Sequence, residues 1–244
     1  MKGFVLAAGF GTRLGSLTRN LPKPLLPVGG FPMIHYNLLL LKKYGITDVM
    51  INSHYLGDKI RKTLGDGSDL GMNFSYSEEA VILGTGGGIK KMARQTNGET
   101  FFVINADILI DLNLDQALAF HRAKQGFATL VLRAPEPGAS FSQISTDKND
   151  QIQSILSQGT FREKQNQQLM FTGVHIMEPR VLDYIPSEKN VSIIDAYLEM
   201  LRCKAPFYGY KMNGYWNDLG DPRRYHQADL DIKEGRFKPA INNT

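Results

Sequence analysis

Cysteine is almost absent from this sequence, and no apolar run is long enough to cross a membrane. The single cysteine, Cys203, cannot form an intramolecular disulfide and leaves no cysteine-based zinc site. The longest strongly apolar runs are no longer than Leu38–Leu41, whereas a membrane-spanning helix needs roughly 20 apolar residues. The N-terminus passes from a short apolar stretch into glycines, unlike a cleavable signal. These absences predict a reduced, cytoplasmic, soluble protein with no membrane contact.

Acidic residues are missing from the N-terminal part of the chain. The net charge of the whole chain is +4 at pH 7, yet residues 1–47 hold six lysines and arginines and no carboxylate. That segment therefore carries +6, and the remaining residues sum to −2. A basic segment rich in glycine and proline favours a loop that holds an anionic ligand, with chance clustering as the alternative. The small overall charge and the lack of an aromatic–basic stripe argue against nucleic-acid binding.

The order of apolar segments indicates the fold class. With 244 residues, 42% hydrophobic and 21% charged, the chain has the composition of a globular protein of one or two domains. Expected strands and helices alternate up to residue 133, which favours parallel crossover units. We therefore expect an α/β fold, with a Rossmann-like, mostly parallel mixed sheet flanked by helices in a single domain. The expected strands are Gly3–Ala8, Ile46–Asn52, Met72–Tyr76, Phe101–Asn105 and Phe127–Arg133, and the expected helices are Pro32–Tyr44, Leu56–Leu64, Gly86–Thr96 and Leu114–Gln125.

The pattern changes in the second half of the chain. Residues 135–170 are polar and rich in Gln and Asn, which predicts a mobile or antiparallel insertion. Asn213-Gly214 is a strong signal for a two-residue hairpin turn between strands at Phe207–Met212 and Tyr215–Leu219. Asp221 is expected to cap a last helix. We predict one domain over residues 1–236 and a frayed tail over 237–244.

A glycine loop follows the first expected strand. Its sequence is Leu6-Ala7-Ala8-Gly9-Phe10-Gly11-Thr12-Arg13. Ligands of open parallel sheets bind beyond the carboxyl ends of strands, and small residues let backbone N–H groups approach phosphate oxygens. The dinucleotide fingerprint fails because Leu14 stands where the third glycine is needed, and the Gly-Lys-Ser/Thr of a P-loop is missing. An ordinary tight turn is the alternative for this loop alone.

Lys23 lies between two prolines, Pro22 and Pro24. Proline fixes its own φ and forces the preceding residue into an extended conformation, so the lysine is directed rather than free. A solvated surface lysine is the alternative. The setting favours a ligand contact.

Together these motifs resemble the signature of the sugar-1-phosphate nucleotidylyltransferases, or nucleotide-sugar pyrophosphorylases. The resemblance extends to about residue 230. We expect no C-terminal hexapeptide-repeat domain, so the sequence resembles the short catalytic-core forms, among them mannose-1-phosphate guanylyltransferase-like and N-acetylmuramate-1-phosphate uridylyltransferase proteins. The segments that carry it are Leu6–Leu14, Pro22-Lys23-Pro24-Leu25, Pro27-Val28, Leu83–Gly88, Ile104–Asp107, Phe171–Val174 and Gly214–Gly220.

The resemblance implies a reaction in which an NTP and a sugar 1-phosphate give an NDP-sugar and pyrophosphate, with Mg²⁺ as cofactor. The attacking phosphate, whose second pKa is about 6, is already an anion at neutral pH, so no general base is needed. The difficulty is to bring two polyanions together and to stabilise the leaving pyrophosphate, which is work for cations and a metal. Two alternatives stay open: a transferase of the same fold with a non-sugar acceptor such as phosphocholine, and a non-catalytic NDP-sugar-binding regulatory subunit.

The resemblance also implies roles for individual residues. Arg13 and Lys23 are the expected catalytic cations, and Asp107 and Asp218 the expected magnesium ligands. Asn105 and Gly173 are expected at the sugar, in a protein that is a monomer or homodimer. The expected nucleotide-binding residues are Leu6, Ala7, Ala8, Gly9, Gly11, Thr12, Arg13, Lys23, Glu79, Gly84, Thr85 and Gly86.

Glu79 supports a hypothesis about the base. The family often has Gln or Glu facing the base at this position, and an ionised carboxylate only accepts hydrogen bonds, which suits the imino N–H of guanine, uracil or thymine. Departures from the family pattern include Ser16, Val81-Ile82, and Glu163-Lys164 without the proline of the sugar motif. Five histidines show no metal-ligand spacing and are expected to be structural: His35, His54, His121, His175 and His226.

Overall fold

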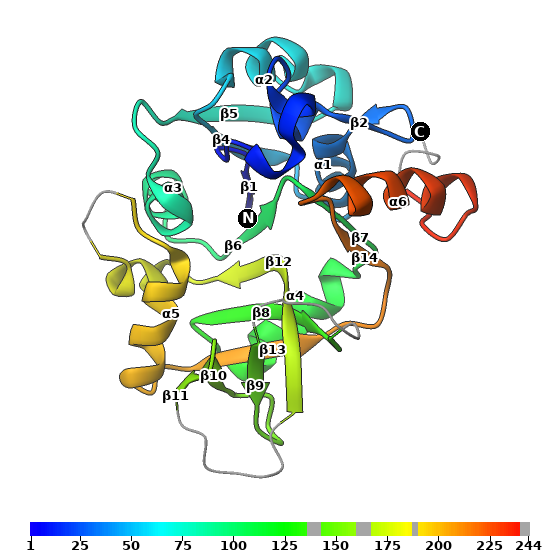
Figure 1. Cartoon of the computed structure of the whole chain (residues 1–244). Coiled ribbons are helices and arrows are strands. Elements are labelled where there is room, and N and C mark those ends of the chain that lie inside the picture. The colour runs from blue at the N-terminus through cyan, green and yellow to red at the C-terminus, as the bar shows by residue number, and fades with distance from the viewer. Residues whose placement is uncertain (136–142, 160–166, 187–189, 240–244) are drawn as a thin grey trace. The chain divides into compact units, whose positions relative to one another are not determined.

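The chain folds into two compact units, and neither unit is continuous in sequence. The computed structural model describes residues 1–135, 143–159, 167–186 and 190–239. Unit 1 comprises Met1–Ile82, Ile104–Leu112 and the segment that begins at Gly214, whereas unit 2 comprises Leu83–Val103 and Asn113–Asn213. Both combine strands with helices, as the predicted α/β class requires (Figure 1). Among the described residues, no helix has the length and apolarity that a membrane crossing demands.

Unit 1 is built on parallel strands. Strand β1 (Lys2–Leu6) pairs with β4 (Asp48–Ser53), which pairs with β5 (Asn73–Glu78), and Leu6, Asn52 and Ser77 lie in one cross-strand row. The other elements of this unit surround the strands or extend the loops between them. They are β2 (Pro27–Val28), β3 (Phe31–Pro32), α1 (Met33–Lys43), α2 (Gly57–Leu64), β7 (Ile108–Ile110), β14 (Trp216–Asp218), α6 (Pro222–Lys233) and 3-10 helices at Thr12–Thr18, Lys23–Leu25 and Ser68–Leu70.

Local signals set the ends of the helices in unit 1. Pro32 is the N-cap of α1, and Gly45, with a φ of 72°, follows its end. At the start of α6, Asp221 accepts a hydrogen bond of 3.0 Å from the Arg224 backbone N–H. The predicted cap at Asp221 is therefore confirmed.

Unit 2 has a mixed sheet. Strand β8 (Ala128–Arg133) pairs antiparallel with β12 (Gln167–Met177) and parallel with β13 (Phe207–Lys211). The described part of the predicted insertion forms antiparallel strands next to β12. The remaining elements are β9 (Gln143–Thr146), β10 (Ile152–Ile155), β11 (Gln158–Gly159), α3 (Gly84–Ala93), α4 (Leu114–Lys124), α5 (Ile193–Arg202) and the 3-10 helix Pro179–Tyr184; β6 (Phe101–Asn105) passes from unit 2 into unit 1.

The hairpin predicted at Asn213-Gly214 is wrong. Strand β13 pairs with β8, whereas β14 pairs antiparallel with β7. A type I′ turn needs positive φ at both central residues, and neither Asn213 nor Gly214 has it. Glycine is needed at 214 for another reason, because a Cβ there would lie 2.0 Å from the Asp111 carbonyl oxygen.

The long loop after β1 is anchored in the core of unit 1. Its residues Leu14, Leu26 and Val28 are buried in one apolar cluster with Met33 and Tyr36 of α1 and with residues of α6. Phe237, where the sequence predicts a frayed tail to begin, is also buried in this cluster. Its ring centroid lies 4.9 Å from that of Tyr215, so the predicted tail does not start at this residue.

Candidate active site

Two aspartates that are far apart in the sequence come together through a short two-stranded ladder. Asp107 lies in the turn between β6 and β7, and Asp218 is the last residue of β14. In the β14–β7 register Asp218 faces Ile108, and the Leu219 N–H donates a hydrogen bond of 3.0 Å to the Asp107 carbonyl. Nonlocal pairing thus places the two predicted metal ligands in one neighbourhood.

Lys23 reaches this neighbourhood from the long loop. Its ammonium Nζ forms an ion pair with Asp107 Oδ2, although only 6% of the residue is exposed. Pro22 holds extended backbone before the 3-10 helix Lys23–Leu25, and the Leu26 N–H donates to the Lys23 carbonyl at 3.0 Å. Lys23 itself lies in the 3-10 helix, so the expectation that Pro24 holds it extended is wrong, whereas the ion pair with Asp107 shows that its side chain is not a solvated surface lysine.

Arg13 approaches the other aspartate across a glycine. A Cβ built at Gly220 would lie 2.7 and 2.8 Å from the two terminal nitrogens of Arg13 and 2.8 Å from Asp218 Oδ1. The guanidinium and the carboxylate therefore both lie against the backbone of Gly220. Two cations and two carboxylates of unit 1, all four singled out from the sequence, form one cluster.

Asp218 is the electrostatically unusual member of this cluster. Burial raises its pKa above the ordinary value, and the neighbouring Asp107 charge raises it further, while Lys23 and Arg13 oppose the shift. Its Oδ1 is buried and has no hydrogen-bond partner among the described residues. A buried carboxylate oxygen without a partner is costly, and a bound cation would remove that cost.

The donor set fits magnesium better than zinc. Among the described residues no three His, Cys, Asp or Glu side chains gather in a metal-binding group. Mg²⁺ favours oxygen ligands and is commonly held by one or two carboxylates together with water and substrate phosphates. Asp107 and Asp218 satisfy that requirement.

A hydrogen-bonded relay joins the glycine loop to Glu79. Asn52, at the carboxyl end of β4, accepts a 2.7 Å hydrogen bond from the Ala7 N–H and donates one of 2.7 Å to Glu79 Oε1. Asn52 and Glu79 are 3% and 4% exposed. Sequence reasoning missed Asn52, although an asparagine at the end of an apolar strand is a usable signal. The predicted nucleotide residues Ala7 and Glu79 are thus linked.

The glycine loop turns sharply at Gly11. Its φ is 68°, and its carbonyl accepts hydrogen bonds from the Leu14 N–H at 3.0 Å and from Thr18 Oγ1 at 3.1 Å. A Cβ at Gly11 would lie 3.0 Å from Cβ of Lys23, whereas one at Gly9 would meet nothing within 4 Å. The rest of the predicted set in this loop, Leu6, Ala8 and Thr12, flanks the same turn.

Comparison with known proteins identifies the family. The profile of the Nucleotidyl transferase family matches residues 2–235. This chain belongs to the nucleotidyl transferase family. It is 33% identical over 98% of its length to a UTP–glucose-1-phosphate uridylyltransferase of Synechocystis sp. and 35% identical over 95% to a mannose-1-phosphate guanylyltransferase of Mycobacterium tuberculosis. It spans 65% and 64% of those two relatives.

A third relative has a length similar to that of this chain. An N-acetylmuramate alpha-1-phosphate uridylyltransferase of Neisseria meningitidis serogroup B is 34% identical over 93% of this chain and 96% of its own. Solved structures agree on the fold. HddC from Yersinia pseudotuberculosis has a TM-score of 0.78 at 22% identity over 95% of this chain and 99% of its own, and a UDP-glucose pyrophosphorylase has 0.78 at 20% over 96% and 99%.

The other glycine motif of this chain lies in unit 2 and makes contacts within the chain. Gly84 has a φ of 71°, and a Cβ there would lie 2.5 Å from the Val191 carbonyl oxygen. The same carbonyl accepts a 2.8 Å hydrogen bond from the Gly86 N–H, and Thr85 Oγ1 accepts one of 2.9 Å from the Ile193 N–H. Close backbone packing explains these glycines, and their contact with a nucleotide stays a prediction.

The predicted sugar-site residues lie in different units. Asn105 ends β6 in unit 1, and its carbonyl accepts a hydrogen bond from the Asn37 side chain at 3.1 Å. Gly173 lies in β12 at an irregularity in the pairing with β8, with a φ of 91° that favours glycine. Glu163-Lys164 fall outside the described residues.

Two of the histidines fit the expected structural role through their contacts. His121 bonds Thr129 Oγ1 at 2.8 Å through Nδ1, and the buried His175 faces the Tyr197 hydroxyl.

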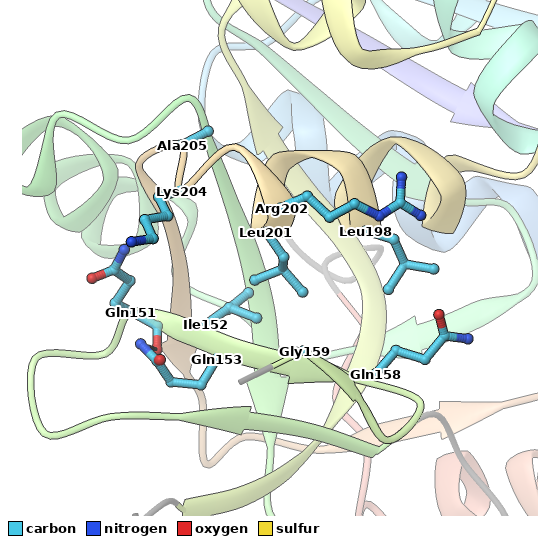
Figure 2. A pocket seen from close by; sticks show the side chains of 10 residues that line it. All are labelled: Gln151, Ile152, Gln153, Gln158, Gly159, Leu198, Leu201, Arg202, Lys204 and Ala205. Atoms are coloured by element: carbon cyan, nitrogen blue, oxygen red, sulfur yellow. Dashed lines mark hydrogen bonds between the residues drawn. The ribbon is translucent and has the colours of Figure 1, made fainter. Parts of the chain in front are cut away.

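Unit 2 also contains a pocket of about 500 Å³ between the end of α5 and the β10–β11 strands. Figure 2 shows Leu201 and Ile152 facing each other within it. None of the site residues predicted from the sequence lines this pocket.

Proposed function

We propose that this protein is a Mg²⁺-dependent sugar-1-phosphate nucleotidylyltransferase. The observation that carries the proposal is the cluster of Arg13, Lys23, Asp107 and Asp218, in which two cations lie beside two carboxylates and one carboxylate oxygen is buried without a partner. Family membership and the names of the relatives support the same reaction. The reaction joins an NTP and a sugar 1-phosphate and releases pyrophosphate.

Each charged group has a separate task in this proposal. Arg13 and Lys23 bind the NTP phosphates and stabilise the charge that develops on the leaving pyrophosphate. Asp107 and Asp218 hold Mg²⁺, which when bound supplies positive charge to the phosphate oxygens. Lys23, now paired with Asp107, exchanges that carboxylate for phosphate oxygens as the substrate arrives. No side chain has to act as a general base, because the sugar phosphate attacks as an anion.

The preferred substrates follow from Glu79 and the relatives. A buried carboxylate held by Asn52 accepts a hydrogen bond from the imino N–H of guanine or uracil. One relative is named a mannose-1-phosphate guanylyltransferase and another an N-acetylmuramate alpha-1-phosphate uridylyltransferase. We therefore propose GTP with a mannose-1-phosphate-like acceptor or UTP with an N-acetylmuramate-1-phosphate-like acceptor.

Pyrophosphate release with Mg²⁺ tests the reaction over a matrix of substrates. The matrix combines ATP, CTP, GTP, UTP and dTTP with the 1-phosphates of glucose, mannose and N-acetylmuramate, and with phosphocholine as a non-sugar acceptor. We expect release with GTP or UTP and a sugar 1-phosphate. Release with phosphocholine alone would favour the non-sugar transferase, and ligand binding without any release would favour a regulatory subunit.

Removal of either carboxylate tests the metal site. Asp107→Ala and Asp218→Ala should each lower kcat by at least 100-fold, the scale expected for a group that acts on transition-state charge. Asp69→Ala, which removes an exposed carboxylate in the same unit, is the matched control and should leave kcat unchanged. Unchanged rates in both site variants would refute the assignment.

A further inference from the structure

Asn37 is an amide on the buried face of a helix that is otherwise strongly apolar there. It lies in α1 and is 1% exposed, next in sequence to the buried residues Tyr36 and Leu38. A buried amide is costly unless its polar atoms form hydrogen bonds. The buried Asn37 amide therefore needs hydrogen-bond partners within the fold.

Both partners of the Asn37 amide nitrogen flank Asp107. Nδ2 donates to the Asn105 carbonyl at 3.1 Å and to the Ile108 carbonyl at 2.9 Å. These two carbonyls bracket the turn from which the Asp107 side chain projects. The partners are 68 and 71 positions away in the sequence, so this contact exists only in the folded chain.

Backbone contacts hold the rest of the same turn. The Ala106 N–H donates to the Leu6 carbonyl at 3.0 Å, and the Leu219 N–H donates to the Asp107 carbonyl at 3.0 Å. The turn is therefore fixed to the end of β1, to the segment that carries Asp218, and to α1. The contact with α1 comes from a side chain, so substitution can remove it.

We propose that Asn37 is a positioning residue for the Asp107 carboxylate and acts through the backbone of residues 105–108. The inference rests on the proposed function, because it requires that Asp107 and Asp218 hold a divalent cation together. Asn37 itself does not touch the metal or the substrates in this arrangement. Without its two hydrogen bonds the turn relaxes, and Asp107 loses its set distance from Asp218.

Binding of Mn²⁺ to the full chain, without substrates, gives a readout that is independent of turnover. Mn²⁺ replaces Mg²⁺ at oxygen sites and is detected by electron paramagnetic resonance. Asn37→Leu keeps the branching at Cγ without a donor, and Asn37→Asp keeps the shape but turns a carboxylate toward two carbonyls. We expect both variants to raise the Kd for Mn²⁺ at least tenfold and to lower kcat, with the KM for the NTP changed less than twofold.

Leu38→Ala is the matched control. Leu38 lies in the same helix and is fully buried, so its truncation destabilises the fold without removing the donor to residues 105 and 108. This control should leave the Kd for Mn²⁺ unchanged. A purely structural role for Asn37 would move the thermal midpoint in all three variants and the Mn²⁺ affinity in none.

The outcomes separate this inference from the proposed function. Wild-type affinity for Mn²⁺ in folded Asn37→Leu overturns the positioning role and leaves the proposed reaction intact. If Asn37→Asp fails to fold, Asn37→Leu decides. Failure of the wild type to bind Mn²⁺, or binding that Asp218→Ala does not weaken, overturns the metal site and the positioning role together.

Discussion

In the proposed reaction the Lys23 ammonium competes with Mg²⁺ for the Asp107 carboxylate. In the structure the two side chains form an ion pair in which Lys23 is nearly buried. A lysine that only balanced the charge of Asp107 would become unnecessary once a divalent cation bound there. A lysine that binds phosphate would still be needed at saturating metal.

Lys23→Met separates these two roles. We expect kcat to fall by about 100- to 1000-fold, as for loss of one group that stabilises transition-state charge. The Mg²⁺ concentration for half-maximal rate should not rise, because without Lys23 no ammonium competes with Mg²⁺ for the Asp107 carboxylate. Steady-state kinetics over a Mg²⁺ titration measures both, with exposed Lys43→Met as control. Full activity of Lys23→Met at saturating Mg²⁺ would contradict a phosphate-binding role.

Burial of His175 makes stability depend on pH. Complete burial lowers its pKa from 6.5 to about 3. As the pH falls from about 6.5 toward 3, the unfolded chain takes up a proton at this site that the folded chain refuses, so the free energy of unfolding decreases. The decrease from this group approaches about 1.4 kcal/mol per pH unit. In urea unfolding at several pH values, the free energy of unfolding of His175→Gln should decrease less steeply with falling pH than that of the wild type. The control His226→Gln, at an exposed histidine, should show the same decrease as the wild type. Parallel pH dependences in wild type and His175→Gln would count against the buried, neutral imidazole.

Among the elements, the β7–β14 ladder decides where Asp218 lies. The Asp111 N–H donates to the Tyr215 carbonyl at 2.9 Å, and Gly214 approaches the Asp111 carbonyl so closely that a side chain has no room. The ladder is short, with three residue pairs at Trp216, Asn217 and Asp218. A small displacement at its start therefore carries directly to the carboxylate.

Gly214→Ala should consequently damage both the fold and the site. The added methyl group would lie 2.0 Å from a backbone oxygen, which forces the two strands apart. We expect a lower thermal midpoint and a loss of most Mn²⁺ binding. Gly235→Ala, at a φ of 72° with open space around the new methyl group, should cost only about 1 kcal/mol of backbone strain and leave metal binding intact. Normal Mn²⁺ affinity in Gly214→Ala would show that the ladder does not set the site.

Local signals in the sequence predict elements better than they predict which elements pair. Pro32 and Gly45 bound α1, and Asp221 caps α6, because those effects depend on neighbours within one helical turn. The Asn213-Gly214 hairpin fails because the demand for glycine comes from Asp111, about 100 positions earlier.

The gathering of Arg13, Lys23, Asp107 and Asp218 was predictable because their motifs are specific, and the roles of these residues stay predictions. Asn37 and Asn52 were missed because their partners are 45 to 71 positions away for three of their four hydrogen bonds and 27 for the other. A polar residue inside an apolar helix or strand indicates that its side chain forms a hydrogen bond in the fold, but the sequence does not identify the partner.

At the scale of the whole molecule, the C-terminal segment completes the core of unit 1. Phe237 is 5% exposed and its ring lies 5.8 Å from that of Tyr36 and 4.9 Å from that of Tyr215, between centroids. Its N–H donates to the Asp231 carbonyl at 3.1 Å. Phe237, near the end of the described chain, therefore contributes to the stability of unit 1.

Phe237→Ala should reduce the free energy of unfolding by about 3 to 5 kcal/mol, the range for loss of a buried aromatic side chain. Urea unfolding monitored by circular dichroism measures the change. Phe31→Ala removes a ring that is 43% exposed and should cost much less. Equal losses in the two variants would indicate that the C-terminal segment does not close the core.

The division of unit 1 among three separate stretches has a consequence for how the protein is made. Residues 1–82 are synthesised well before Asp218 and α6, the helix that packs on the long loop. At about 5 to 20 residues per second, the N-terminal segment waits about 7 to 27 s for the segment that carries Asp218. A growing chain that stops before β14 carries Arg13, Lys23 and Asp107 but not the second carboxylate. Chains cut short before β14 therefore lack one of the two carboxylates of the proposed metal site.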